Sequence, residues 1–154
     1  MPASLKKETV ILLIGEGGEA LARELDIAAM PLGFVSSDRL KVIACSAADV
    51  LVHPSRGETF GLVLIESMAC GTPIVSYDVG GIPQLVRHGF TGYLAEPENP
   101  KQLAEYIVQL LEDATGRAQL GLQCREIALN EYPLHLYIDR HVKLYQEILE
   151  PVGA

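Results

Sequence analysis

The stretch "PSRGETFGLVLIESMACGTP", Pro54 to Pro73, follows a short apolar run and carries two carboxylates, Glu58 and Glu66, among small and apolar residues. Its first part has the glycine and proline spacing of a loop. Its second part, "LVLIESMAC", predicts a helix that ends at Gly71. At about 100° per residue this helix has almost no polar face, so we expect it to be buried. A strand followed by a loop and a buried helix indicates a parallel α/β fold.

The same alternation extends outward in both directions from this stretch. Apolar runs rich in β-branched residues predict strands at 9–14, 30–35, 49–54, 73–78 and 91–96, with helices between them, one of them capped by Ser36 or Ser37. After Pro97 the pattern predicts only helices, at 101–113, 115–131 and 134–149. We therefore expect one α/β domain over 1–154, a Rossmann-like three-layer sandwich with a mainly parallel sheet of five or six strands. Its sheet-and-helix core spans about 9–113 and its C-terminal helices about 114–150.

Composition excludes several classes of partner. The 154 residues are 49% hydrophobic and 21% charged, which is typical of a globular domain, and the net charge is -8. Without a basic cluster, a nucleic-acid partner is not expected. The three cysteines are scattered, which indicates neither a disulfide framework nor a metal site and favours a reducing, cytoplasmic location. The apolar run at 9–14 is too short to span a membrane.

The two carboxylates have separate physical interpretations. A buried Glu66 would need a partner, supplied either by the protein or by ligand hydroxyls. Glu58 precedes a helix N-terminus whose unpaired amides, Thr59 to Val63, would suit a diphosphate. Two plainer interpretations stay open: Glu58 as an ordinary acid at a helix N-terminus, and Glu66 as half of a structural pair with an arginine.

The segment Ala48 to Ile107, which reads "ADVLVHPSRGETFGLVLIESMACGTPIVSYDVGGIPQLVRHGFTGYLAEPENPKQLAEYI", strongly resembles the C-terminal, donor-binding domain of retaining glycosyltransferases of the family 4 type. The resemblance extends from about Thr9 to Glu150, and Glu58 and Glu66 match the E-x7-E motif of that family. It implies one half of a two-domain GT-B enzyme. Such an enzyme moves a hexose from a nucleoside diphosphate sugar, such as a UDP- or GDP-sugar, to an acceptor, without a metal or other cofactor.

The resemblance also implies roles for single residues. Glu66 corresponds to the carboxylate that binds the ribose hydroxyls, and Glu58 to the catalytic-site carboxylate that contacts the donor sugar. Arg56 borders the anion cradle and is a candidate cation. The remaining expected positions are backbone contacts: to the diphosphate and sugar at Thr59, Phe60, Gly61 and Leu62, to the base at Val35, and to the nucleotide at Gly15 and Gly17. The pair Gly80 and Gly81 matches a glycine pair in a neighbouring loop, for which the resemblance gives no definite role.

Two features depart from the family pattern. Members carry an arginine and a lysine in a "GR…KG" segment that neutralises the leaving diphosphate, whereas this chain has only "MPASLKKE" there. The N-terminal acceptor domain is also absent from these 154 residues. We therefore expect a donor-binding half that is inactive alone and works with the missing half in cis or in trans. A membrane-associated acceptor on that half, and a homodimer through the last helix, stay open.

Two further interpretations compete with this one. "GEGGEA" after a strand, with Asp38 about 20 residues on, fits a dinucleotide-binding fingerprint and favours an NAD-binding Rossmann domain. That interpretation leaves Glu58 and Glu66 unexplained. The other is a noncatalytic nucleotide-binding or interaction module that keeps the fold.

Overall fold

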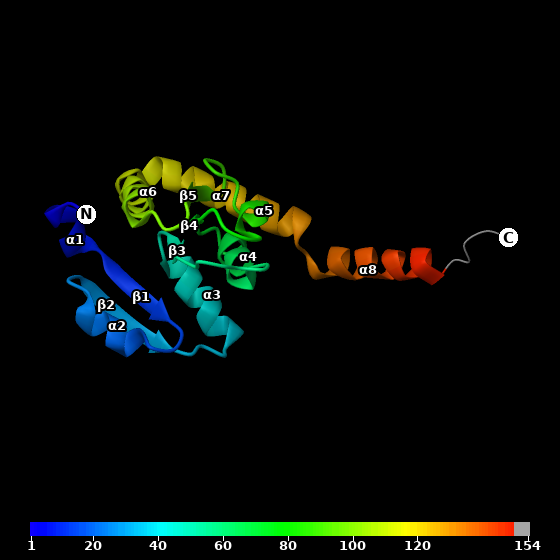
Figure 1. Ribbon diagram of the computed structural model, residues 1–154, viewed down its shortest axis with the longest axis horizontal. Coiled ribbons are helices and arrows are strands. Elements are labelled where there is room, and N and C mark those ends of the chain that lie inside the picture. The colour runs from blue at the N-terminus through cyan, green and yellow to red at the C-terminus, as the bar shows by residue number, and fades with distance from the viewer. Residues whose placement is uncertain (150–154) are drawn as a thin grey trace.

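A computed structural model describes residues 1–149 and confirms the α/β class. Five strands alternate with helices up to residue 95, and helices alone follow (Figure 1). The strands are β1 (Val10–Ile14), β2 (Ala28–Gly33), β3 (Leu51–His53), β4 (Ile74–Tyr77) and β5 (Gly92–Ala95). The helices are α1 (Ala3–Glu8), α2 (Gly18–Glu24), α3 (Asp38–Ala47), α4 (Leu62–Ala69), α5 (Ile82–Leu85), α6 (Pro100–Glu112), α7 (Ala114–Glu131) and α8 (Leu134–Leu149).

Strand β4 is the centre of the molecule. It pairs in parallel with β3 on one side and β5 on the other, and all four of its residues are buried. Successive side chains of a strand point to opposite faces of the sheet. Ile74 accordingly belongs to one apolar core, and Val75 and Tyr77 to another. This is why the sequence of β4 is an apolar run rather than an alternation of apolar and polar residues.

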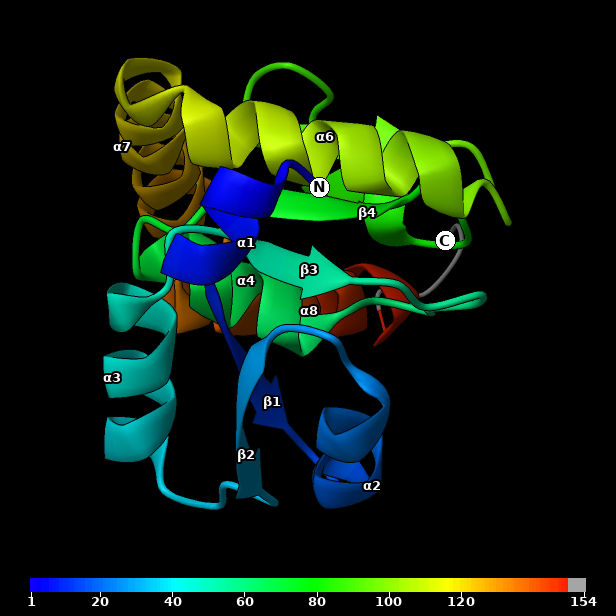
Figure 2. The same ribbon diagram turned by 90° about the vertical axis from the view of Figure 1, so that its left-hand side faces the viewer.

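The two cores give the three layers that the sequence predicts. Helices α4, α5 and α7 fill the core on one face, while α6 and the first half of α7 fill the core on the other face. Figure 2 shows α6 on one side of strands β3 and β4 and α4 on the other. The first core contains Leu64, Met68, Ile74, Ile82, Leu85, Val86, Cys124, Ile127 and Ala128. The second contains Val75, Tyr77, Ala95, Leu103, Leu110 and Leu120.

The expectation of one continuous sheet is wrong. The five strands are all parallel but form two separate sheets, β1–β2 and β3–β4–β5, and Figure 1 shows the first pair apart from the other three strands. A parallel sheet is stable when helices cover both of its faces. Helix α2 packs on the β1–β2 pair, yet Val10, Ile14 and Met30 remain about half exposed. The described residues thus leave this pair only partly covered, and no strand pairing joins it to β3.

Most element boundaries agree with the sequence to within about two residues. Strand β2 begins at Ala28, two residues before the expected start, and α1 was not expected. Helix α3 begins at the predicted Asp38, and the Ser37 side chain accepts a hydrogen bond from the Leu40 amide at 3.5 Å. As expected, residues 101–149 contain no strand.

Helix α8 projects away from the rest of the chain (Figure 1). None of its residues is buried. Its exposed apolar side chains are Leu134, Tyr137, Ile138, Val142, Leu144, Tyr145, Ile148 and Leu149.

Candidate functional site

The loop that connects β3 to α4 holds Glu58 in a defined position. One carboxylate oxygen, Oε1, accepts hydrogen bonds from the backbone amides of Thr59 at 2.9 Å and Phe60 at 3.3 Å. Hydrogen bonds from amides stabilise the ionised carboxylate. The Phe60 amide, followed by the Thr59 amide and His53, lowers the pKa of Glu58 below its ordinary value, although partial burial opposes this. Two amides that the sequence assigned to a diphosphate are therefore occupied here by Glu58 itself.

His53 is the second neighbour of Glu58. It ends strand β3, and its Nε2 lies 3.3 Å from Glu58 Oε2, although not in hydrogen-bond alignment. The backbone of His53 is fixed by the Ser76 hydroxyl, which donates to the His53 carbonyl at 2.6 Å. The central strand β4 thus holds the residue that faces Glu58.

The glycine pair after β4 presses directly against this loop. The Gly81 amide donates to the Glu58 carbonyl at 2.8 Å. A Cβ atom on Gly80 would lie 2.1 Å from the Glu58 carbonyl oxygen, and one on Gly81 would lie 2.1 Å from that of Thr59. No side chain fits at such distances. The role of this pair, which the sequence left open, is therefore to let two backbones approach closely and to set the position of Glu58.

Helix α4 starts at Leu62, as predicted, and its start is formed by backbone alone. Gly61 is the N-cap in a left-handed conformation, with φ of 82°, and no side chain caps the helix. The unpaired amides of a first turn carry a partial positive charge. They adjoin Glu58, because a Cβ atom on Gly61 would lie 3.3 Å from Glu58 Cγ. A helix start without a side-chain cap and a carboxylate therefore meet at the carboxyl end of β3.

The expectation that Glu66 is buried is wrong. Its side chain is 43% exposed, and Lys41 of α3 donates to its Oε1 at 3.1 Å. Helix α4 buries only the face that carries Leu64, Ser67 and Met68, whereas Leu62 is 68% exposed. Its apolar periodicity suggested burial all round, but no described element packs over Leu62. A partner within the protein, one of the alternatives left open, is present, and it is a lysine rather than an arginine.

Lys41 connects helix α3 to helix α4. Its Nζ lies 2.9 Å from Asp38 Oδ1 as well as 3.1 Å from Glu66 Oε1. The Asp38 carboxylate first, and Glu66 second, raise the pKa of Lys41 above its ordinary value. Sequence reasoning missed this residue. The available signal was a single lysine between apolar neighbours in "RLKVI".

The other predicted positions lie on the β1–β2 side. The amide of Gly15, in the turn after β1, donates to the Gly33 carbonyl at the end of β2 at 2.8 Å. Gly17 is the N-cap of α2, and partly exposed Val35 lies in the segment between β2 and α3. The structure thus brings Glu58, Gly61 and the glycine pair together, and joins Glu66 to the segment after Val35 through Lys41. Arg56 is exposed and forms no ion pair within residues 1–149.

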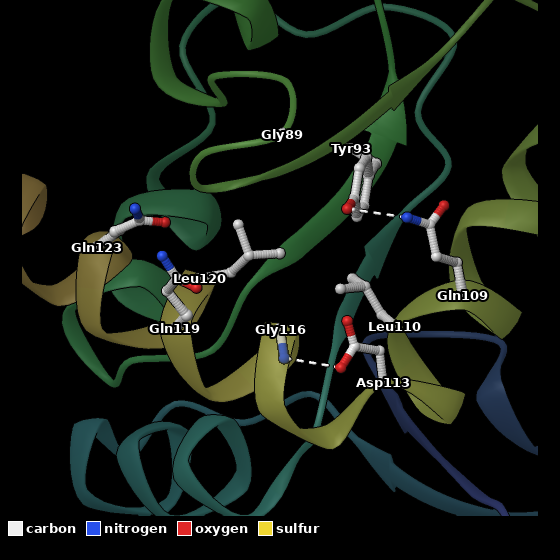
Figure 3. A pocket seen from close by; sticks show the side chains of 9 residues that line it. All are labelled: Gly89, Tyr93, Gln109, Leu110, Asp113, Gly116, Gln119, Leu120 and Gln123. Atoms are coloured by element: carbon white, nitrogen blue, oxygen red, sulfur yellow. Dashed lines mark hydrogen bonds between the residues drawn. The ribbon is translucent and has the colours of Figure 1, made fainter.

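A pocket of about 190 Å³ lies elsewhere, between β5, α6 and α7 (Figure 3). Two of its polar groups already bond to neighbours. Gln109 Nε2 lies 3.0 Å from the Tyr93 hydroxyl, and the Asp113 carboxylate accepts from the Gly116 amide at 2.8 Å. It includes none of the predicted site residues. Its lining residues are Gly89, Tyr93, Gln109, Leu110, Asp113, Gly116, Gln119, Leu120 and Gln123.

The parallel α/β fold and its likeness to solved structures define the class of protein, a Rossmann-like domain of the GT-B glycosyltransferase type. Residues 2–127 match the family model described as "Glycosyl transferases group 1", and the chain belongs to this family. The activity of this family is accordingly glycosyl transfer.

Two curated relatives resemble nearly the whole chain. One is N-acetyl-alpha-D-glucosaminyl L-malate synthase of Bacillus anthracis, 32% identical over 90% of this chain and 38% of the relative. The other is D-inositol 3-phosphate glycosyltransferase of Thermobispora bispora, 35% identical over 97% of this chain and 39% of the relative. The chain thus spans about two fifths of the length of these relatives.

A solved structure supports the same assignment. Anabaena HepE in complex with UDP superimposes with a TM-score of 0.77, is 26% identical, and is matched over 92% of this chain and 42% of its own. The same protein has been solved with UDP-glucose.

No helix within residues 1–149 has the length and apolar character needed to cross a membrane. The same residues hold no cluster of three or more histidine, cysteine or acidic side chains suited to a metal ion.

Proposed function

We propose that this chain is the donor-binding domain of a retaining glycosyltransferase. It binds a nucleoside diphosphate sugar whose hexose is passed to an acceptor held by another part of the enzyme. The observation that carries the proposal is the site after β3. A helix start capped only by backbone lies between an acid in the loop before it and an acid inside it. Ligands of parallel α/β proteins bind at this edge of the sheet.

In this proposal the ligand extends along the start of α4. Lys41 holds Glu66 Oε1, and the other oxygen of Glu66 accepts hydrogen bonds from the ribose hydroxyls. The amides of Gly61 and Leu62 face the diphosphate, and Val35, Gly15 and Gly17 lie on the base side. Glu58 turns toward the sugar and releases the amides of Thr59 and Phe60, which then face the phosphate oxygens. Arg56, in the same loop, adds positive charge near the phosphates.

The rest of the enzyme is proposed to pack on α8. The apolar side chains of α8, such as Tyr137 and Ile148, are exposed along a helix that has no buried residue, and large exposed apolar patches mark interaction sites. The relatives have more than twice the length of this chain, and their remaining part would supply both the acceptor site and a cover for α8. A homodimer through α8 is the alternative, and sedimentation of the purified chain distinguishes the two.

Ligand-dependent stabilisation tests the proposed function. UDP or GDP, and UDP-glucose, are expected to raise the melting temperature of the purified chain by about 5–10 °C at a hundredfold excess over Kd, because they bind only the folded state. NAD is expected to leave it unchanged and serves as the control. Stabilisation by NAD alone would instead support the dinucleotide interpretation of "GEGGEA". No stabilisation by any of these ligands would support a noncatalytic interaction module.

A further inference from the structure

Helix α3 supplies a side chain to the donor site that the E-x7-E motif does not include. Lys41 crosses from α3 to α4 and lies 3.1 Å from Glu66 Oε1, and α3 and α4 pack together along this line. The same ammonium group lies 2.9 Å from Asp38, the first residue of α3. Lys41 therefore joins the segment after β2 to the acid on α4 through two ion pairs.

Burial shows that this arrangement contributes little to stability. The side chains of Lys41 and Glu66 are 30% and 43% exposed, and that of Asp38 is 92% exposed. Ion pairs this accessible to water usually add little to the stability of the fold. Their effect is geometric, because a glutamate side chain on a half-exposed helix face otherwise samples several rotamers.

We propose that Lys41 is a positioning residue that holds the Glu66 carboxylate in the orientation needed to accept the ribose hydroxyls. This inference rests on the proposed function of Glu66. The ammonium fixes Oε1, and no hydrogen bond within residues 1–149 engages the other oxygen, which in this proposal accepts from the ribose. A side chain fixed before binding loses less conformational entropy when the ligand arrives. Lys41 itself need not touch the nucleotide.

Ribose discrimination provides a specific test. Calorimetry gives the Kd of UDP or GDP, whichever binds more tightly, and the Kd of its 2′,3′-dideoxy analogue, and the two values are compared. We expect Lys41→Met to weaken binding of the ribonucleotide by about 3- to 10-fold. The affinity for the dideoxy analogue should stay within about twofold of the wild-type value. Lys41→Arg, which keeps a cation of similar reach, is expected to restore the preference for ribose. Lys101→Met removes an equal charge from an exposed pair with Glu105 on α6 and serves as the matched control.

The possible results separate the two proposals. If the wild type prefers ribose and Lys41→Met keeps that preference, Lys41 has no positioning role, although the role of Glu66 stands. Equal weakening of both nucleotides by Lys41→Met would show a merely structural effect and overturn the inference. If the wild type binds both nucleotides equally, Glu66 does not bind ribose, and the inference falls with it. Should Lys41→Met fail to fold cooperatively, Lys41→Gln is measured in its place with the same criteria.

Discussion

A polypeptide of these 154 residues is expected to bind a nucleotide sugar and yet transfer its sugar far more slowly than about one per second, a normal enzymatic rate. Holding an acceptor against the anomeric carbon can supply about 7–11 kcal/mol of the barrier. The chain spans about two fifths of its relatives, and the acceptor site is proposed to lie in the remainder. The loss of positioning alone therefore predicts a rate lower by at least about 10⁵-fold.

The electrostatics of the site are expected to lower the transfer rate further. Cations stabilise the charge that develops on a leaving diphosphate. Among the described residues, Lys6 is paired with Asp26, and Lys41 is held between Asp38 and Glu66. Arg56 is left as an exposed cation in the loop before α4.

The measurement is the release of UDP from UDP-glucose, or of GDP from a GDP-sugar, with water and with simple sugars as acceptors. Calorimetric binding of the same donor by the same preparation is the control, because it shows that the site is intact. Turnover of order one per second would contradict the prediction and assign a complete active site to these residues.

The second large effect is expected for Gly80→Ala, which should lower the free energy of unfolding by about 2–5 kcal/mol. Two costs combine at this position. Gly80 has a φ of 54°, a conformation that L-residues avoid, and its Cβ would lie 2.1 Å from the Glu58 carbonyl oxygen. Since that atom belongs to the backbone, the loop itself must move. Binding of the sugar-bearing donor is expected to fall with it.

Two matched variants separate these costs. Gly89→Ala has a φ of 76° with open space around the new atom, so it should cost only the strain, about 1–2 kcal/mol. Gly81→Ala has an ordinary φ but meets the Thr59 carbonyl at 2.1 Å, so it should cost only the clash, about 1–3 kcal/mol. Urea unfolding measures all three variants. If Gly80→Ala is no worse than Gly89→Ala, the contact between the glycine pair and the Glu58 loop does not fix the site.

Local features of the sequence predicted the elements well, because they depend on neighbouring residues. The apolar run of β4, a serine cap of α3 at Ser36 or Ser37 and the start of α4 at Leu62 were all anticipated. Features that depend on long-range packing were not. The separation of β1–β2 from β3 reflects which helices cover each sheet, and periodicity does not contain this information.

The candidate site, too, could be predicted from the sequence only in part. The acids at Glu58 and Glu66 and the glycine pair could be selected from sequence, but their partners could not. Lys41 reaches Glu66 across 25 residues of chain, and the Glu58 carboxylate turns back onto its own loop amides. The burial expected for Glu66 failed because the periodicity of a helix does not reveal whether a neighbour covers each face.

The most direct test of the central claim is calorimetry of Glu66→Ala and Glu58→Ala, each with the bare nucleoside diphosphate and with its sugar-bearing form. Glu66→Ala is expected to weaken the binding of both ligands by about 1–3 kcal/mol, which is the magnitude of hydrogen bonds to a charged group. Glu58→Ala is expected to weaken binding of the sugar-bearing donor only, because the Glu58 carboxylate is proposed to contact the sugar and not the nucleotide. If the two variants lose equal affinity for the bare nucleoside diphosphate, this division of roles is contradicted. A Glu66→Ala protein that is destabilised but binds nucleotide normally would show that Glu66 serves only the ion pair with Lys41.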